Sequence, residues 1–240
     1  MTARVVGDGF RRMIAADAVK TPLDHVKLAG ARLWTDFRTM VVLVGLLWLI
    51  EIGDQVWQRM PGGHSLDLLG IKPRDAWGLM GLLFAPFVHH GFGHLLSNTL
   101  PLVILGWLML VGGRWLFVRA TAVIVLVSGL GTWLLGTPNS VHLGASGVIY
   151  GWLAFLLVRG FLEMSVRWVV VSVAIGVLYA WNFTLFQLDA QTSTSAHLFG
   201  FFGGLLAAWI FFYLPKRRSG LTLPGLGTGG KSTALPPKST

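Results

Sequence analysis

Long apolar stretches alternate with short polar connections over most of this chain. Six stretches consist almost entirely of apolar residues: 39–57, 94–111, 115–135, 146–161, 168–186 and 196–214. A helix of about 20 such residues crosses roughly 30 Å of hydrocarbon. The pattern therefore predicts an all-α polytopic membrane protein, a bundle of six transmembrane helices. The fourth stretch is short and has a polar start, so its helix is expected to begin below the membrane surface.

The segments around these stretches differ in character. Residues 1–38 mix basic and apolar positions, which predicts a basic arm that is solvated or lies on anionic lipid as a surface helix. Residues 58–93 form a long, half-apolar first connection, part of which is expected to lie in the membrane interface. Residues 215–240 are rich in Gly, Pro, Ser, Thr and Lys, as disordered tails are. The predicted organisation is an arm (1–38), a six-span core (39–214) and a tail (215–240).

The composition agrees with a membrane protein. Hydrophobic residues make up 54% of the 240 positions and charged residues only 12%, against roughly 25% charged in soluble domains. The chain has no cysteine, which excludes disulfides, thiolate metal sites and cysteine nucleophiles. The first apolar run begins near Thr39, too late and too long for a cleavable signal peptide, so none is expected.

The basic residues predict an orientation. The formal net charge of +9 could indicate nucleic acid, but the charges gather at the chain ends and in certain loops, a pattern of membrane topology. We therefore expect no nucleic-acid partner and place both termini in the cytoplasm. The opposite side keeps only Arg59, Lys72 and Arg74. Sixteen of the 19 Lys and Arg residues lie on the side of the termini: Arg4, Arg11, Arg12, Lys20, Lys27, Arg32, Arg38, Arg114, Arg119, Arg159, Arg167, Lys216, Arg217, Arg218, Lys231 and Lys238.

A serine stands at the head of the fourth stretch. Ser146 lies between Gly144 and Gly147, which allow a sharp turn and close approach of a substrate. The free N–H groups and the dipole of a helix N-terminus favour a developing negative charge there. The segment differs from the hydrolase elbow G-x-S-x-G, because Val148 replaces its last glycine. Ser146 is a candidate nucleophile; the alternative is a helix cap with small-residue packing through Gly147.

A histidine occupies the sixth stretch. Gly200 and Gly204 lie three and seven residues after His197 and share its helical face, which permits close approach to the Ser146 helix. Polar groups at membrane depth are functional candidates, so we expect a Ser146–His197 dyad without a third member. The alternative is a histidine that is hydrogen-bonded inside the bundle.

The second stretch offers a pair of hydrogen-bond donors. His94 and Asn98 are spaced i, i+4 and lie on one helical face, where they could stabilise an oxyanion; Asn98 could instead join helices. His89 or His90 in the preceding loop could orient the site. The spacing of His90 and His94 also fits the zinc motif H-E-x-x-H, but no Glu follows His90, so we expect no metal and no cofactor.

Taken in order, these motifs resemble a known family. The second, fourth and sixth stretches carry, in this order, His94-x-x-x-Asn98, Gly144-x-Ser146-Gly147 and Ala196-His197-x-x-Gly200-x-x-x-Gly204. This order of motifs resembles that of the rhomboid intramembrane serine proteases. The resemblance covers most of residues 39–214. The resemblance implies that Ser146 is the nucleophile and His197 the general base. It also implies an oxyanion role for His94 and Asn98, a structural role for His89, and packing of Tyr150 on the catalytic imidazole.

Two departures concern the first connection. The Trp-Arg pair usual in the family is absent, with Trp77-Gly78 and Gly81 as the nearest candidates. Ala85 stands where many bacterial members have a further histidine.

The function that the resemblance implies is cleavage of transmembrane segments near the outer face. Substrates would be single-span membrane proteins that enter from the bilayer of a bacterial plasma membrane. The residues Trp181-Asn182-Phe183 and the 187–195 loop are candidates for a gate and lid. Two alternatives remain: a rhomboid-like protein that binds membrane helices without cutting them, and a transporter or channel. The physiological substrate and the oligomeric state are not predicted.

Overall fold

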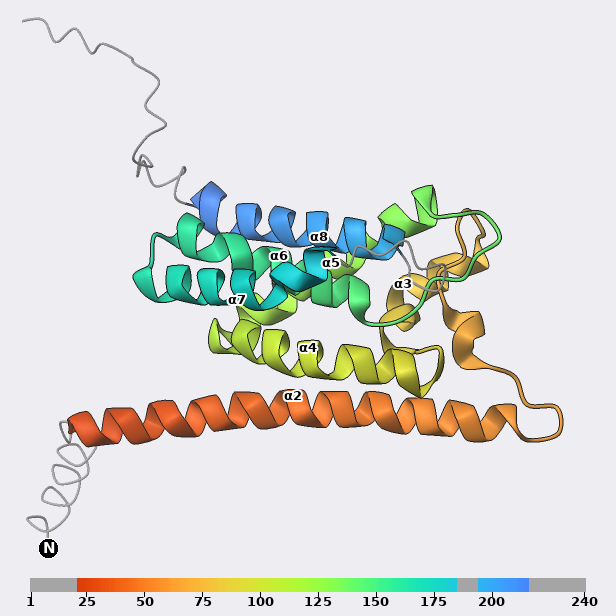
Figure 1. Ribbon diagram of the computed structural model, residues 1–240, viewed down its shortest axis with the longest axis horizontal. Helices are drawn as coiled ribbons and strands as arrows, with labels where there is room; N and C mark the ends of the chain where they lie inside the picture. The colour runs from red at the N-terminus through yellow and green to blue at the C-terminus, as the bar shows by residue number, and fades with distance from the viewer. Residues whose placement is uncertain (1–20, 185–193, 216–240) are drawn as a thin grey trace, which may run out of the picture.

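A computed structural model describes residues 21–184 and 194–215 and confirms an all-helical bundle (Figure 1). Within the described residues, five helices are long and apolar enough to cross a membrane, and α7 has a shorter apolar run, Val166–Tyr179. The six long helices are α2 (Pro22–Gln58), α4 (Gly91–Val111), α5 (Arg114–Leu135), α6 (Ser146–Glu163), α7 (Val166–Thr184) and α8 (Thr194–Ala208), which a π-helical turn, η4 (Trp209–Tyr213), extends.

The first helix is longer than its apolar stretch. It begins at Pro22 because Thr21 caps it: the Thr21 side chain accepts from the Asp24 N–H, and the Asp24 side chain accepts from the Thr21 N–H. Its 37 residues extend over about 55 Å, well beyond roughly 30 Å of hydrocarbon. The second half of the predicted arm is therefore a continuation of α2 past the end of the bundle, as Figure 1 shows.

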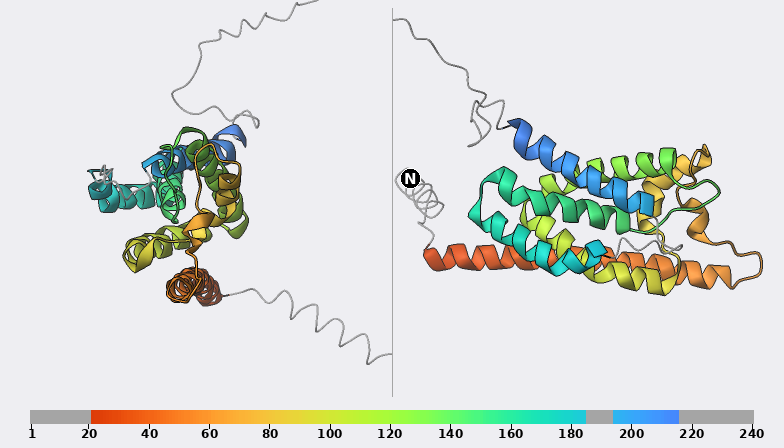
Figure 2. Two further views of the ribbon diagram at one scale, coloured as in Figure 1. Left: turned by 90° about the vertical axis from the view of Figure 1, so that its right-hand side faces the viewer. Right: turned by 45° about the horizontal axis from the view of Figure 1, so that its top comes forward.

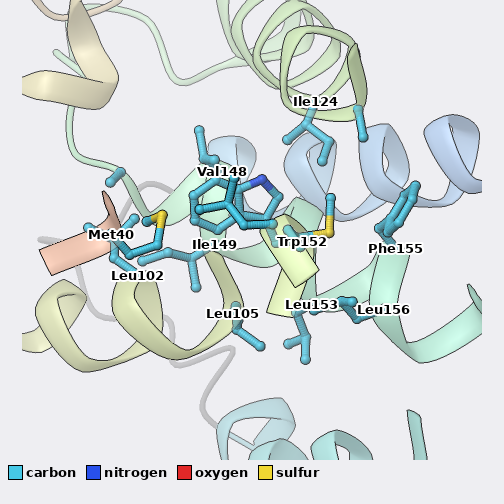
Figure 3. Packing of buried hydrophobic residues seen from close by; sticks show 14 of the residues in the cluster. Met40, Leu102, Leu105, Ile124, Val148, Ile149, Trp152, Leu153, Phe155 and Leu156 are labelled. Atoms are coloured by element: carbon cyan, nitrogen blue, oxygen red, sulfur yellow. The ribbon is translucent and has the colours of Figure 1, made fainter. Parts of the chain in front are cut away.

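Helix α6 occupies the centre of the bundle. Buried residues make up 61% of its apolar window, against 28–39% in the four other long spans, and it packs against α8, α7, α4 and α5. Trp152 lies in the core among side chains of α2, α4, α5 and α6 (Figure 3), and its indole N–H donates to the Thr121 hydroxyl at 2.9 Å. The apolar faces of α6 are thus covered by the four helices around it.

The contact between α6 and α8 is made by backbone. A side chain at Gly200 would collide with the carbonyl oxygen of Gly147, and one at Gly204 with the carbonyl oxygen of Gly151. Small residues with this spacing let membrane helices approach closely. The predicted glycine face on α8 is therefore present, and it packs against the glycines of α6.

Short elements of the first connection cover one end of the bundle, at the right of Figure 1: η1 (Leu66–Leu69), η2 (Trp77–Met80), α3 (Gly81–Phe84) and η3 (Ala85–Phe87). Ile71 and His142 exchange two backbone hydrogen bonds of 2.7 and 2.9 Å, which join this connection to the loop before α6. The Arg74 guanidinium donates to the carbonyls of Leu134 and Gly136 at the end of α5. Figure 2 shows the same end from two further directions.

We predict that Gly204→Ala destabilises the bundle by about 1–3 kcal/mol, the usual range for overpacking, because a Cβ there has no room beside the Gly151 backbone. Thermal unfolding in detergent, followed by circular dichroism, measures the loss. Gly45→Ala is the matched control, since nothing lies within 4 Å of a Cβ at Gly45 on α2, and helix propensity alone should stabilise that variant. Equal effects of the two substitutions would contradict the packing described here.

Candidate functional site

Ser146 is the first residue of α6. The chain reaches it through Gly144, which adopts a φ of +104°, a conformation that residues with side chains rarely take. Ser146 is 8% exposed. The N–H groups of the first helical turn have no partner within the helix, and the positive end of the helix dipole lies beside the serine.

His197 lies near the start of α8 and stacks on a residue of α6. Its ring is nearly parallel to the ring of Tyr150, with 4.3 Å between centroids and 20° between planes. Tyr150 comes one turn after Ser146 and shares its helical face. Three of the residues that the sequence singled out are thus brought to one face of the α6–α8 contact.

His94 packs against the turn before Ser146. A side chain at Gly144 would lie 2.5 Å from Cε1 and 2.9 Å from Nε2 of His94, so the imidazole rests on the glycine backbone. Asn98 is 5% exposed, and its Nδ2 donates to the His94 carbonyl oxygen at 3.0 Å. The amide keeps a second N–H, which leaves it one donor that this contact does not use.

His89 supports the same turn from the first connection. Its Nε2 accepts from the Ala145 N–H at 3.3 Å, and its ring lies 5.3 Å from the His94 ring. His89 is 1% exposed. Burial first, and the charge of His94 second, lower the pKa of His89 to about 4, so His89 is neutral near pH 7. A neutral ring can accept from the Ala145 amide and hold the residue before Ser146.

The sequence of this chain matches a known protein family. The profile of the rhomboid domain matches residues 76–214, more than half of the chain. The chain belongs to the rhomboid family. An uncharacterized protein of Mycobacterium tuberculosis is 39% identical over 201 residues, which cover 80% of this chain and 81% of that protein. One of Mycobacterium leprae is 35% identical over 192 residues, 75% and 73% of the two chains.

A more distant relative carries a functional name. The candidate rhomboid protease YdcA of Bacillus subtilis is 26% identical over 200 residues, which cover 78% of this chain and 94% of that protein. The resemblance noted from three short motifs is thus confirmed at the level of the family.

In this rhomboid, the first connection contacts the turn before Ser146 through a backbone hydrogen bond. Where many bacterial members have a histidine, the carbonyl oxygen of Ala85 accepts from the Gly144 N–H at 2.8 Å, and Ala85 is 3% exposed. Trp77, the nearest candidate for the missing Trp-Arg pair, is 81% exposed and so does not pack into the bundle. The turn before Ser146 is therefore held by the carbonyl of Ala85 and the ring of His89.

Sequence reasoning missed two residues beside the site. The Ser128 hydroxyl on α5 donates to the Ala196 carbonyl at 3.0 Å, and a side chain at Gly147 would meet this hydroxyl. His142 pairs with Ile71 through its backbone, and burial lowers the pKa of its ring. Together they line a cavity of about 20 Å³, room for one water. The polar Ser128 inside an apolar stretch was the available signal.

The remaining candidates fall elsewhere. His90 points to Asp67, with 2.6 Å between Nδ1 and Oδ2. Within residues 21–184 and 194–215, no group of three or more His, Cys, Asp or Glu side chains could hold a metal ion. The side chains of Trp181, Asn182 and Phe183, and most of the 187–195 loop, lie outside the described residues.

We predict that the folded protein loses stability as the pH falls from about 6.5 to 4. The unfolded chain protonates His89 near pH 6.5 and the folded chain only near its pKa of about 4. His89 therefore stabilises the fold fully above pH 6.5, by at most about 3 kcal/mol, and loses this contribution on acidification.

Thermal unfolding in detergent at a series of pH values tests this. His89→Asn should flatten the acid side of the stability profile, whereas the exposed His64 offers a control, His64→Asn, that should keep the wild-type slope. An unchanged slope in His89→Asn would show that the ring is not buried in its neutral form.

Proposed function

We propose that this rhomboid is an intramembrane serine endopeptidase with Ser146 as nucleophile and His197 as general base. The observation that carries the proposal is the stacking of His197 on Tyr150, at 4.3 Å between ring centroids, one helical turn after Ser146. A nucleophilic serine needs a base within hydrogen-bond reach, oriented by a third group. The aromatic ring of Tyr150 supplies that orientation here.

The chemistry follows from these positions. His197 takes the hydroxyl proton as Ser146 attacks the scissile carbonyl carbon, and the carbonyl oxygen becomes an oxyanion. The donors for this oxyanion are the His94 ring, the Asn98 amide and the N–H of Ser146. His197 then gives its proton to the leaving amine. Water attacks the acyl-enzyme with His197 again as base, which releases the second product and restores Ser146.

The substrate is a transmembrane segment of another protein, cut near the outer face. The basic residues near the other end of the bundle, Arg114, Arg159 and Arg167 among them, support a cytoplasmic location of that end under the positive-inside rule. The site then faces the outer half of a bacterial plasma membrane. A substrate helix must expose its backbone to be cut, so small or helix-breaking residues near the cleavage point should favour cleavage.

We predict that the purified protein, reconstituted in lipid vesicles, cleaves a single-span test substrate, and that Ser146→Ala and His197→Ala each abolish cleavage. Gel and mass analysis of the products gives the rate and the position of the cut. Ser165→Ala, just past the opposite end of α6, is the matched control and should cut like the wild type. If the wild type captured the substrate span but never cut it, the helix-binding function would replace the protease.

We predict that Asn98→Ala lowers kcat about 10²–10³-fold, the effect of removing one oxyanion donor, with little change in KM. Ser97→Ala is a close control, because the Ser97 hydroxyl donates to the same His94 carbonyl at 2.7 Å but lies on the exposed face of α4. A similar fall in both variants would mean that Asn98 acts only through the His94 backbone.

A further inference from the structure

A large groove lies between α2 and α5, on the side of α6 away from His197. Its volume is about 680 Å³, within the range of about 300–1,000 Å³ typical of small-molecule sites. It extends from Met40 and Phe117, near the basic end of the bundle, to Leu83 and Phe87 in the first connection. The proposed protease chemistry does not use it.

The lining of the groove is almost entirely apolar and therefore suits a hydrocarbon chain. Thr121 is the one lining residue with a hydroxyl, and this hydroxyl already accepts from the Trp152 indole at 2.9 Å. A peptide segment would bring N–H and C=O groups that find no partner on such walls, at a considerable cost. A saturated chain brings none.

The basic end of the groove carries a charged entrance. Asp36 lies one turn before Met40 on α2, and Arg114 one turn before Phe117 on α5, so both stand on the groove faces of their helices. Arg114 Nε is 3.5 Å from Asp36 Oδ1. Asp36 is buried, with 1% of its side chain exposed, whereas 63% of the Arg114 side chain is exposed and can meet an anion outside.

We propose that this groove binds an acyl chain of a phospholipid whose phosphate pairs with Arg114. The guanidinium suits phosphate because it offers several fixed N–H donors, and the bilayer leaflet around the basic end supplies the ligand. A second transmembrane helix fits less well, since it would have to continue past Leu83 and Phe87 at one end and the Asp36–Arg114 pair at the other. An acyl chain requires only that the groove be open at the end beside Arg114, where the headgroup lies.

The bound chain would pack behind the nucleophile. Ala145 and Val148 line the groove and lie immediately before and two residues after Ser146. The lipid therefore fills space that would otherwise be empty against the first turn of α6. Lipid binding in the groove requires insertion in a membrane but does not depend on whether Ser146 cleaves a substrate.

The test counts retained lipids. The full chain is reconstituted in vesicles of phosphatidylethanolamine and phosphatidylglycerol (3:1), extracted in mild detergent and examined by native mass spectrometry. Ala122→Phe puts a ring into the groove, because Ala122 lines it and is exposed there. Val118→Phe does the same from the next position on that face, in case one variant folds poorly. Ala174→Phe, an exposed alanine of α7 outside the groove, is the matched control.

The wild type and Ala174→Phe should retain a phospholipid that the groove-filling variants lose several-fold. Arg114→Gln should weaken retention of the same lipid, and Arg114→Lys should restore it. Equal lipid counts in the wild type and both groove-filling variants would overturn the proposal. So would disulfide-linked dimers of Ala122→Cys in the membrane, which are unambiguous in a chain without cysteine, because they would put a second copy in the groove.

Discussion

Helices α6 and α8 approach so closely that their backbones are in contact, and this contact positions the residues of the candidate site. Gly147 and Gly151 on one helix face Gly200 and Gly204 on the other with no space for side chains between them. The hydrophobic effect does not drive the association of helices within lipid, so this contact is stabilised by shape complementarity and van der Waals interactions. It fixes His197 at the distance from α6 where its ring stacks on Tyr150, and any separation of the helices would undo that stacking.

A second constraint acts at the head of α6. The turn at Gly144 takes a backbone conformation that costs other residues free energy, and it persists because its neighbours hold it. The Ala85 carbonyl and the His89 ring accept from the amides of Gly144 and Ala145, and the His94 ring covers the turn. The first connection thus serves to position Ser146, and a chain that lacks the usual Trp-Arg pair still holds it by backbone contacts.

Much of this could be predicted from the sequence, because two signals are strong in a membrane. Apolar length predicts the spans, and isolated polar residues such as Ser146, His197 and Asn98 stand out against them. The glycine face on α8 was visible for the same reason. The start of α2 was missed because Thr21 and Asp24 form their capping box in a segment without an apolar stretch. The Ile71–His142 pair, the contact of Ser128 with Ala196 and the groove between α2 and α5 depend on which distant segments meet, and no local pattern encodes that.

We propose that the α6–α8 contact turns Ser146 into an activated nucleophile. A fluorophosphonate reacts with such a serine and leaves a stable adduct, without the need for a known substrate. The most direct measurement is to treat the protein in lipid vesicles with this reagent and map the adduct by peptide mass spectrometry, for the wild type and His197→Ala. We expect a single adduct on Ser146 in the wild type and its loss in His197→Ala. Folded wild-type protein without an adduct, or labelling of Ser146 that does not depend on His197, would contradict it.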